Sequence, residues 1–301
     1  MPVIGFLSVG APMPSAASVA AFRQGLADTG YIEGQNVAIE YRGSGGHLHQ
    51  LPRLAAELVE RKVDAIVTTG GPEAAFAAKK ATTTIPIVFS VALDPAEVGL
   101  LEDPTRPEGN LTGIIVLDEE LFLKQIELLS ELLPQVRIIA LLANAHNPVL
   151  RKPVMSEVQE ATNARGIELQ RLATSTEAEI NAAFAVLGQK EGRALLVAGD
   201  RFFDHQREQL VALTIRHAIP AIFYNRLYAE AGGLISYGLM IGAASRQVGI
   251  YVGRLLAGTK PADLPVQQPT AVELVINLRT AKLLDLTVPQ TLLSRADKVI
   301  E

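Results

Sequence analysis

The chain has 301 residues, a hydrophobic content of 49%, a charged content of 20% and a formal net charge of −5. These are values of a globular protein, and the length is enough for two domains that each bury a core. The basic residues are scattered, so the charge pattern is unlike that of a nucleic-acid-binding protein. The absence of cysteine excludes thiol catalysis, Cys-type zinc sites and disulfides, and it fits an oxidising compartment.

The amino-terminal segment has no charged side chain before Arg23. Pro12 and Pro14 interrupt it and no basic segment precedes it, which is unlike a signal peptide. We interpret Met1 before Pro2 as a start placed on a mature chain, with an export signal presumed removed. No apolar run approaches the roughly 20 residues that span a membrane.

In the first half, short β-branched runs alternate with amphipathic stretches, which predicts a parallel sheet with helices on both faces. Gly30 follows the first predicted helix, where a left-handed glycine often ends a helix. The predicted strands are 3–8, 37–41, 64–68, 85–89 and 112–116, and the predicted helices include 15–30 and 51–62.

The second half repeats this layout. Gly166 matches Gly30, and Pro220 before the run Ala221-Ile222-Phe223 matches Pro86 before Ile87-Val88-Phe89. Two copies predict two similar lobes with a ligand cleft between them. The predicted strands are 137–142, 167–172, 194–198, 220–224 and 233–237, and the predicted helices include 147–165 and 203–217.

The end of the chain does not repeat. A helix over 243–257, a turn-rich connector, a strand-like run over 266–277 and a short helix over 280–286 are predicted. We expect lobe one to hold residues 1–116 and 241–264, and lobe two to hold 119–237 and 268–301. The chain would then cross between lobes near 116–119, 237–241 and 264–268, and three crossings would form a hinge.

Ligands of open parallel sheets bind at the carboxyl ends of the strands. The sharpest candidate there is Thr69-Gly70-Gly71, before Pro72 at the start of a helix, whose free N–H groups attract a carboxylate or phosphate. A tight turn that binds nothing explains these residues equally well. Other turns at these ends contain Ser8, Ser90, Asp94, Asn144, Asp200, Tyr224, Tyr237 and Gly238.

Motifs for catalysis and cofactors are weak. Neither a dinucleotide fingerprint nor a P-loop lysine motif is present, and the histidines lack zinc-ligand spacing, so no cofactor and no metal are expected. Asp94 and Asp200 could form a hydrolase pair, but an aspartate at a turn is more often a cap. Asp200, Arg201, Tyr224, Arg226 and Tyr237 are better recognition groups, although the two arginines could equally be solvated.

Several longer motifs carry a resemblance to a known family. The segment from Gly30-Tyr31 through Gly34-Gln35-Asn36-Val37 to Glu40-Tyr41-Arg42 resembles ABC transporter substrate-binding proteins that include tryptophan/tyrosine-type binders. Further matches cover nearly the whole chain: Thr82 to Val88, Gly109 to Gly113, Ala229 to Leu234, Gly249 to Gly253 and Leu264 to Pro269.

The resemblance implies a type I periplasmic binding-protein fold of two doubly wound α/β lobes. It implies a non-enzymatic, periplasmic or extracytoplasmic receptor, expected to be a monomer, that captures a small carboxylate-bearing solute such as an amino acid in the interlobe cleft. Its partner would be an ABC permease with its ATPase. The family's pocket loops correspond by position to Ser8, Thr69, Gly70, Gly71, Ser90, Asp94, Asn144, Asp200, Tyr224, Tyr237 and Gly238.

The chain departs from the family near this pocket. Arg201 stands where members often have proline, and Gly242-Ala243-Ala244-Ser245 stands where many carry an Asp and a Tyr. The ligand need not therefore be tryptophan or tyrosine. A sensory module of the same fold and a doubly wound enzyme remain alternatives. For the receptor, Tyr237→Ala is expected to weaken binding without unfolding the lobes.

Overall fold

The computed structural model describes residues 1–10, 15–92, 94–116, 119–145, 152–188 and 191–301. The chain divides into two compact units, which we describe separately. The first unit comprises Met1–Leu117 and Ile241–Thr270, and the second comprises Asp118–Met240 and Ala271–Glu301. Residues 117 and 118, within the crossing expected near 116–119, lie outside the described residues.

The segment expected to cross near 264–268 belongs to the first unit. The backbone N–H of Val266 donates to Pro104 (2.9 Å), and that of Gln267 donates to Gly113 (3.2 Å). Leu264 is fully buried in the same unit. These contacts hold the connector on the first sheet, so the division falls between Thr270 and Ala271.

In its described residues the first unit has a five-stranded sheet in the order β2-β1-β3-β4-β5, and all its pairings are parallel. The predicted parallel sheet is confirmed, and each predicted strand overlaps the observed one. The strands are β1 (Val3–Ser8), β2 (Ala38–Gly43), β3 (Ala65–Thr69), β4 (Ile87–Val91) and β5 (Leu111–Ile115).

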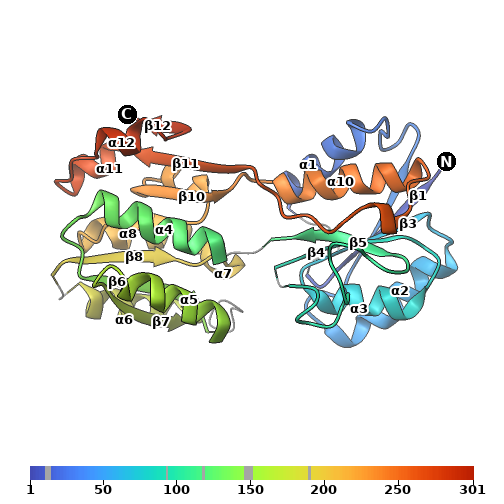
Figure 1. Cartoon of the computed structure of the whole chain (residues 1–301), viewed down its shortest axis with the longest axis horizontal. Helices are drawn as coiled ribbons and strands as arrows, with labels where there is room; N and C mark the ends of the chain where they lie inside the picture. The colour runs from blue at the N-terminus through green and yellow to red at the C-terminus, as the bar shows by residue number, and fades with distance from the viewer. Residues whose placement is uncertain (11–14, 93, 117–118, 146–151, 189–190) are drawn as a thin grey trace. The chain divides into compact units, whose positions relative to one another are not determined.

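Helices cover both faces of the first sheet (Figure 1). Because strand side chains alternate, Ile4 and Phe6 of β1 pack against α1 and α10, whereas Leu7 packs against α2 and α3. The helices are α1 (Ala16–Ala27), α2 (Leu51–Glu60), α3 (Pro72–Ala81) and α10 (Ala243–Leu256), with 3-10 turns η1 (Leu48–Gln50) and η3 (Pro261–Asp263).

The described part of the second unit has a seven-stranded sheet in the order β12-β11-β10-β9-β8-β6-β7. The predicted strands of this half are confirmed by overlap. The strands are β6 (Ile138–Asn144), β7 (Glu168–Thr174), β8 (Arg193–Val197), β9 (Ala221–Phe223), β10 (Ile235–Leu239), β11 (Val272–Asn277) and β12 (Lys298–Ile300).

One pairing departs from the expected parallel order, because β11 runs antiparallel to β10. The chain leaves the unit after Met240 and returns at Ala271, and the N–H of Met240 donates to the carbonyl of Ala271 (2.8 Å). It therefore re-enters beside the end of β10 and has to run back along it. The final strand β12, parallel to β11, is not predicted by the sequence pattern.

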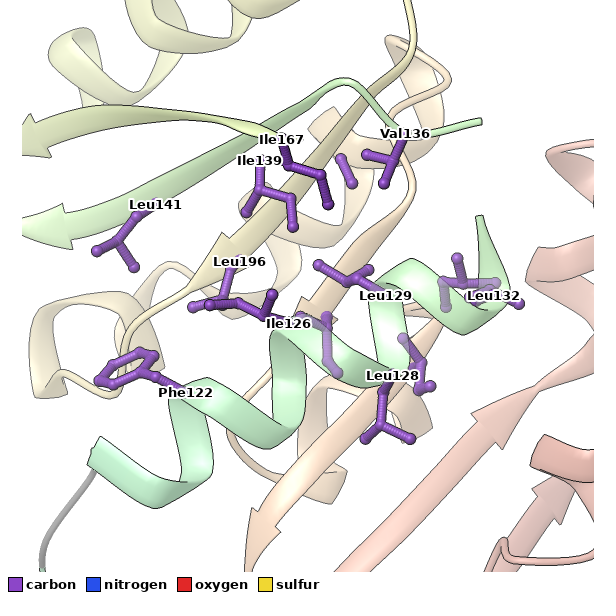
Figure 2. Close-up of a cluster of buried hydrophobic side chains, with 14 of the residues drawn as sticks. Phe122, Ile126, Leu128, Leu129, Leu132, Val136, Ile139, Leu141, Ile167 and Leu196 are labelled. Carbon is purple, nitrogen blue, oxygen red and sulfur yellow. The ribbon is translucent and has the colours of Figure 1, made fainter. Parts of the chain in front are cut away.

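The second core lies on both faces of this sheet. On one face, Phe122, Ile126 and Leu129 of α4 point toward the strand residues Ile139 and Leu141 (Figure 2). On the other face, the alternate residues of the same strand, Ala140 and Leu142, pack with α6 and α8. The helices are α4 (Glu119–Leu132), α5 (Lys152–Asn163), α6 (Glu177–Leu187), α7 (Arg201–His205), α8 (Arg207–Arg216), α9 (Arg226–Glu230), α11 (Leu278–Leu283) and α12 (Gln290–Leu293).

Two predicted helices differ in detail. The helix expected over 203–217 is divided into α7 and α8 at Gln206, which ends the first and precedes the second. The helix expected over 147–165 is observed as α5, and its first predicted residues, 147–151, lie outside the described residues. No described helix is both long and apolar enough to cross a membrane.

Candidate functional site

In the first unit, three of the predicted site residues lie in the carboxyl-terminal part of three adjacent strands. Ser8 ends β1 and Thr69 ends β3, whereas Ser90 lies within β4 and not after it. The side chain of Ser8 is buried, and its hydroxyl accepts the N–H of Gly10 (3.1 Å). Parallel strands end at one edge, so the sheet brings these hydroxyl-bearing residues to the same edge.

The turn from Thr69 into α3 is built on two glycines. Gly70 has φ 86° and Gly71 has φ 149°, backbone conformations that residues with a Cβ atom rarely adopt. The carbonyl of Thr69 accepts the N–H of Val9 (3.1 Å), which ties this turn to the loop after β1. Among the described residues, no side chain caps the start of α3.

An acid of the chain itself lies at this helix start. Glu73, in the first turn of α3, has its carboxylate Oε2 2.4 Å from where a Cβ at Gly71 would stand. A carboxylate there is favourable, because the helix dipole is positive at its start. The turn thus has the features of a tight connection, and the binding of an outside carboxylate stays a prediction.

Asp94 acts within its own turn. Its carboxylate Oδ1 accepts the N–H of Ala96 (2.7 Å), and its carbonyl accepts the N–H of Val98 (3.2 Å). This is the capping role that aspartate commonly has at turns.

In the second unit, two predicted residues meet across 56 positions of sequence. The side-chain amide of Asn144, at the end of β6, donates to the carboxylate Oδ1 of Asp200, after β8 (3.1 Å). The same carboxylate oxygen accepts the N–H of Phe202 (2.8 Å) and so caps α7. The hydroxyl of Ser175 lies 3.4 Å from the side-chain amide oxygen Oδ1 of Asn144. The neighbouring strands β6 and β8 therefore present a carboxylate and an amide together.

Tyr224, directly after β9, uses its hydroxyl inside this unit. The hydroxyl donates to the carboxylate of Asp204 in α7 and lies 3.4 Å from the hydroxyl of Tyr228. Burial, with added effects of Tyr228 and Asp204, raises the pKa of Tyr224 far above its ordinary value. Its proton therefore stays in place at physiological pH.

Tyr237 and Gly238 lie in β10 at the same carboxyl edge. The ring of Tyr237 is half-buried against the core that α4 covers, and its carbonyl accepts the side-chain amide of Gln125 (2.7 Å). A Cβ at Gly238 would lie 1.9 Å from the carbonyl oxygen of Tyr224, so only glycine fits this approach.

The remaining predicted groups are less informative. Arg201 begins α7, and the position of its side chain lies outside the described part of the structure. Arg226 lies 3.9 Å from the carboxylate of Glu273 in β11, and its Nε has no hydrogen-bond partner among the described residues. The described residues contain no cluster of three or more acidic or histidine side chains that could hold a metal ion.

The sequence analysis did not identify three residues that the structure places against predicted site residues. Gln125 bonds to Tyr237, Asp204 bonds to Tyr224, and Glu273 lies beside Arg226. Gln125 is 2% exposed in a helix whose buried side is otherwise apolar. A polar residue at a core-facing position was thus the available signal. No sequence signal marked Asp204, because its partner Tyr224 lies 20 residues away on another element.

These features define a class of protein. Two α/β units with largely parallel sheets, each with polar groups at the carboxyl edge, constitute the type I periplasmic binding-protein fold. The family model described as "ABC transporter substrate binding protein" matches residues 11–300. The chain belongs to this family, so it is a substrate-binding component of ABC transport. Such proteins act outside the cytoplasm, bind small solutes and work with an ABC permease.

Individual relatives agree with this assignment. A tyrosine-binding protein of Clostridioides difficile (strain R20291) is 27% identical over 265 residues, covering 88% of this chain and 75% of the relative. A solved structure from Streptococcus pneumoniae, described as an ABC domain in complex with L-Trp, is 25% identical with a TM-score of 0.79. A conserved domain protein from Vibrio cholerae is 26% identical with the same TM-score. Both structures match over 99% of each chain.

Proposed function

We propose that this chain is the receptor for an amino acid with an aromatic or other apolar side chain, and that the carboxyl edge of the second unit binds the ammonium group. The observation that carries the proposal is the Asn144–Asp200 pair. Asp200 offers a carboxylate that is only part-buried, and a carboxylate is the group that an ammonium ion binds most strongly through charge-assisted hydrogen bonds.

The relatives support this choice of solute. One is named for tyrosine binding and another is described with bound L-Trp. Tyr237, half-buried at the same edge as Asp200, supplies an aromatic surface suited to an apolar side chain. No catalytic chemistry is required of these groups, and we propose that the protein is a non-enzymatic monomer.

Calorimetric titration with L-Trp, L-Tyr, L-Phe and L-Leu tests the proposal. Two analogues of tryptophan separate its charges, because tryptamine lacks the carboxylate and indole-3-propionate lacks the ammonium group. We expect at least one amino acid to bind and both analogues of a tryptophan-type ligand to bind more weakly. Mass spectrometry should recover the ligand unchanged, and light scattering should give the monomer mass.

Matched variants locate the ammonium site. Asp200→Asn should weaken affinity about tenfold to a hundredfold, because it removes a charged hydrogen-bond acceptor. Asp103→Asn is the control, since Asp103 accepts from Thr105 within its own exposed turn. Equal affinity in wild type and Asp200→Asn, or no binding by any amino acid in the panel, would contradict the proposal.

A further inference from the structure

Tyr224 is held from several directions within the second unit. Its hydroxyl donates to the carboxylate of Asp204, and it lies 3.3 Å from the carbonyl oxygen of Asp200 and 3.4 Å from the hydroxyl of Tyr228. A phenol has a single proton to donate, and a carboxylate is the strongest of these acceptors. The proton therefore goes to Asp204.

Two glycines make room for this arrangement. A Cβ at Gly199 would lie 3.2 Å from the ring of Tyr224, tighter than ordinary contact. A Cβ at Gly238 would overlap the Tyr224 carbonyl oxygen at 1.9 Å. The ring of Tyr228 lies 5.3 Å from that of Tyr224, centroid to centroid. Both the ring and the backbone of Tyr224 thus fit closely to their surroundings.

The partner of Tyr224 lies on a helix that needs support. The helix α7 spans only Arg201–His205, far shorter than helices that are stable alone. Its start is Asp200, whose carboxylate accepts the N–H of Phe202 and whose carbonyl accepts the N–H of Asp204 (3.0 Å). Tertiary contacts must keep α7 formed: Phe203 is fully buried in the core, and Tyr224 supplies a hydrogen bond to Asp204 in the last part of the helix.

We propose that Tyr224 is a positioning residue of the solute site: its hydroxyl, through Asp204, holds α7 so that the carboxylate of Asp200 stays beside Asn144. That the position of Asp200 matters for solute binding rests on the proposed function. That Tyr224 stabilises α7 rests on the contacts alone. The alternative is that the Tyr224 hydroxyl contacts solute directly, as the sequence suggested.

Hydrogen exchange of the ligand-free protein tests the hold on α7. The probes are three backbone amides of α7 and its end. Those of Phe202 and Asp204 donate to Asp200, and that of Gln206 donates to the carbonyls of Phe202 and Phe203. We expect Tyr224→Phe and Asp204→Ala to speed exchange about tenfold, the effect of a lost hydrogen bond to a charged group. Asp204→Asn keeps an acceptor oxygen and should give a smaller change.

A double-mutant cycle on solute affinity separates positioning from direct contact. If Tyr224 acts through Asp204, Tyr224→Phe should weaken binding roughly tenfold in the wild type and little further in Asp204→Ala. If the hydroxyl contacts solute, Tyr224→Phe should cost the same in both backgrounds. Tyr251→Phe is the control, because it also removes a tyrosine hydroxyl, bonded to the carbonyl of Pro265 in the first unit.

The outcomes are distinct. Faster exchange in both single variants, no further increase in the double variant and non-additive affinity losses support the proposal. Unchanged exchange in Tyr224→Phe, or additive affinity losses, would overturn it. If the wild type binds no solute, the proposed function fails, and the exchange measurements still decide whether Tyr224 holds α7.

Discussion

The carbonyl oxygen of Phe22 lies 2.2 Å from the position that a Cβ atom would occupy at Gly249. The two residues lie on α1 and α10, which are far apart in the sequence. Gly25 repeats the relationship in reverse, since its Cβ would lie 1.9 Å from the carbonyl oxygen of Arg246. The two helices therefore pack backbone to backbone. This packing attaches the segment Ile241–Thr270, which contains α10, to the first unit.

Gly249→Ala should destabilise the protein. The added methyl group meets backbone atoms that cannot turn aside, and overpacking of this kind costs about 1–3 kcal/mol. Urea unfolding should show a lower midpoint than the wild type. Arg254→Ala, at an exposed position of the same helix, is the control and should stay within about 0.5 kcal/mol. Equal midpoints for Gly249→Ala and wild type would refute the close packing.

Gly238→Ala should weaken solute binding. The new Cβ would meet the carbonyl oxygen of Tyr224, so the loop after β9 has to move away from β10. We expect an affinity loss of about tenfold or more by titration calorimetry, since small displacements in a site are costly. Gly166→Ala, where a Cβ has open space but φ is 67°, controls for a general loss of stability. Equal solute affinity in Gly238→Ala and Gly166→Ala would show that Gly238 does not contribute to the binding site.

Tyr237→Leu should reduce affinity for an aromatic amino acid while retaining most of the fold. Leucine keeps apolar contact with the core beside α4 but removes the aromatic surface, an interaction of about 0.5–1.5 kcal/mol beyond area burial. The alanine variant should in addition lower the unfolding temperature, because the ring is half-buried. Calorimetry and thermal unfolding report the two effects, with Tyr31→Leu in the first unit as control. Unchanged affinity in Tyr237→Leu would exclude the ring from the site.

Glu273→Gln should stabilise the protein at neutral pH. Glu273 is buried, and desolvation raises its carboxyl pKa, an effect that Arg226 and Lys298 oppose and that Asp297 and Glu230 reinforce. Folding therefore favours the protonated carboxyl. As the pH rises above about 4, the unfolded chain loses this proton first, so the contribution of Glu273 to stability falls.

The corresponding measurement is the thermal midpoint of wild type and Glu273→Gln between pH 4 and pH 8. The advantage of the glutamine variant should grow with pH and nearly vanish at the acid end. A variant that is less stable than wild type at pH 8 would show that the ion pair of Glu273 with Arg226 outweighs desolvation. Glu108→Gln, at an exposed position of the first unit, is the control.

Local sequence signals predicted much of the fold. Gly30 and Gly166 follow α1 and α5 with φ values of 89° and 67°, as expected for residues that end helices. Pro86 and Pro220 stand one residue before β4 and β9, and their carbonyls accept from β3 and β8 (2.8 Å each). Such signals depend on the backbone preferences of single residues, so they can be read without the fold.

The candidate site was predicted less completely. The rule that ligands bind at the carboxyl ends of strands selected Asn144 and Asp200, which the structure brings together. The same rule selected Asp94, which caps its own turn, and Tyr224, whose hydroxyl is engaged by Asp204. A strand-end position indicates the edge on which a residue lies, but not the partner to which its side chain bonds.

The sequence by itself determined the succession of strands and helices, the duplicated layout and the family, because periodicity and motifs are properties of neighbouring residues. Only the tertiary structure decided that the connector stays with the first unit as far as Thr270 and that β11 runs antiparallel to β10. It also decided that Tyr224 bonds to Asp204. These features depend on close contacts between elements that are separated in the sequence, such as the backbone approach at Gly249, and such contacts exist only once the chain has folded.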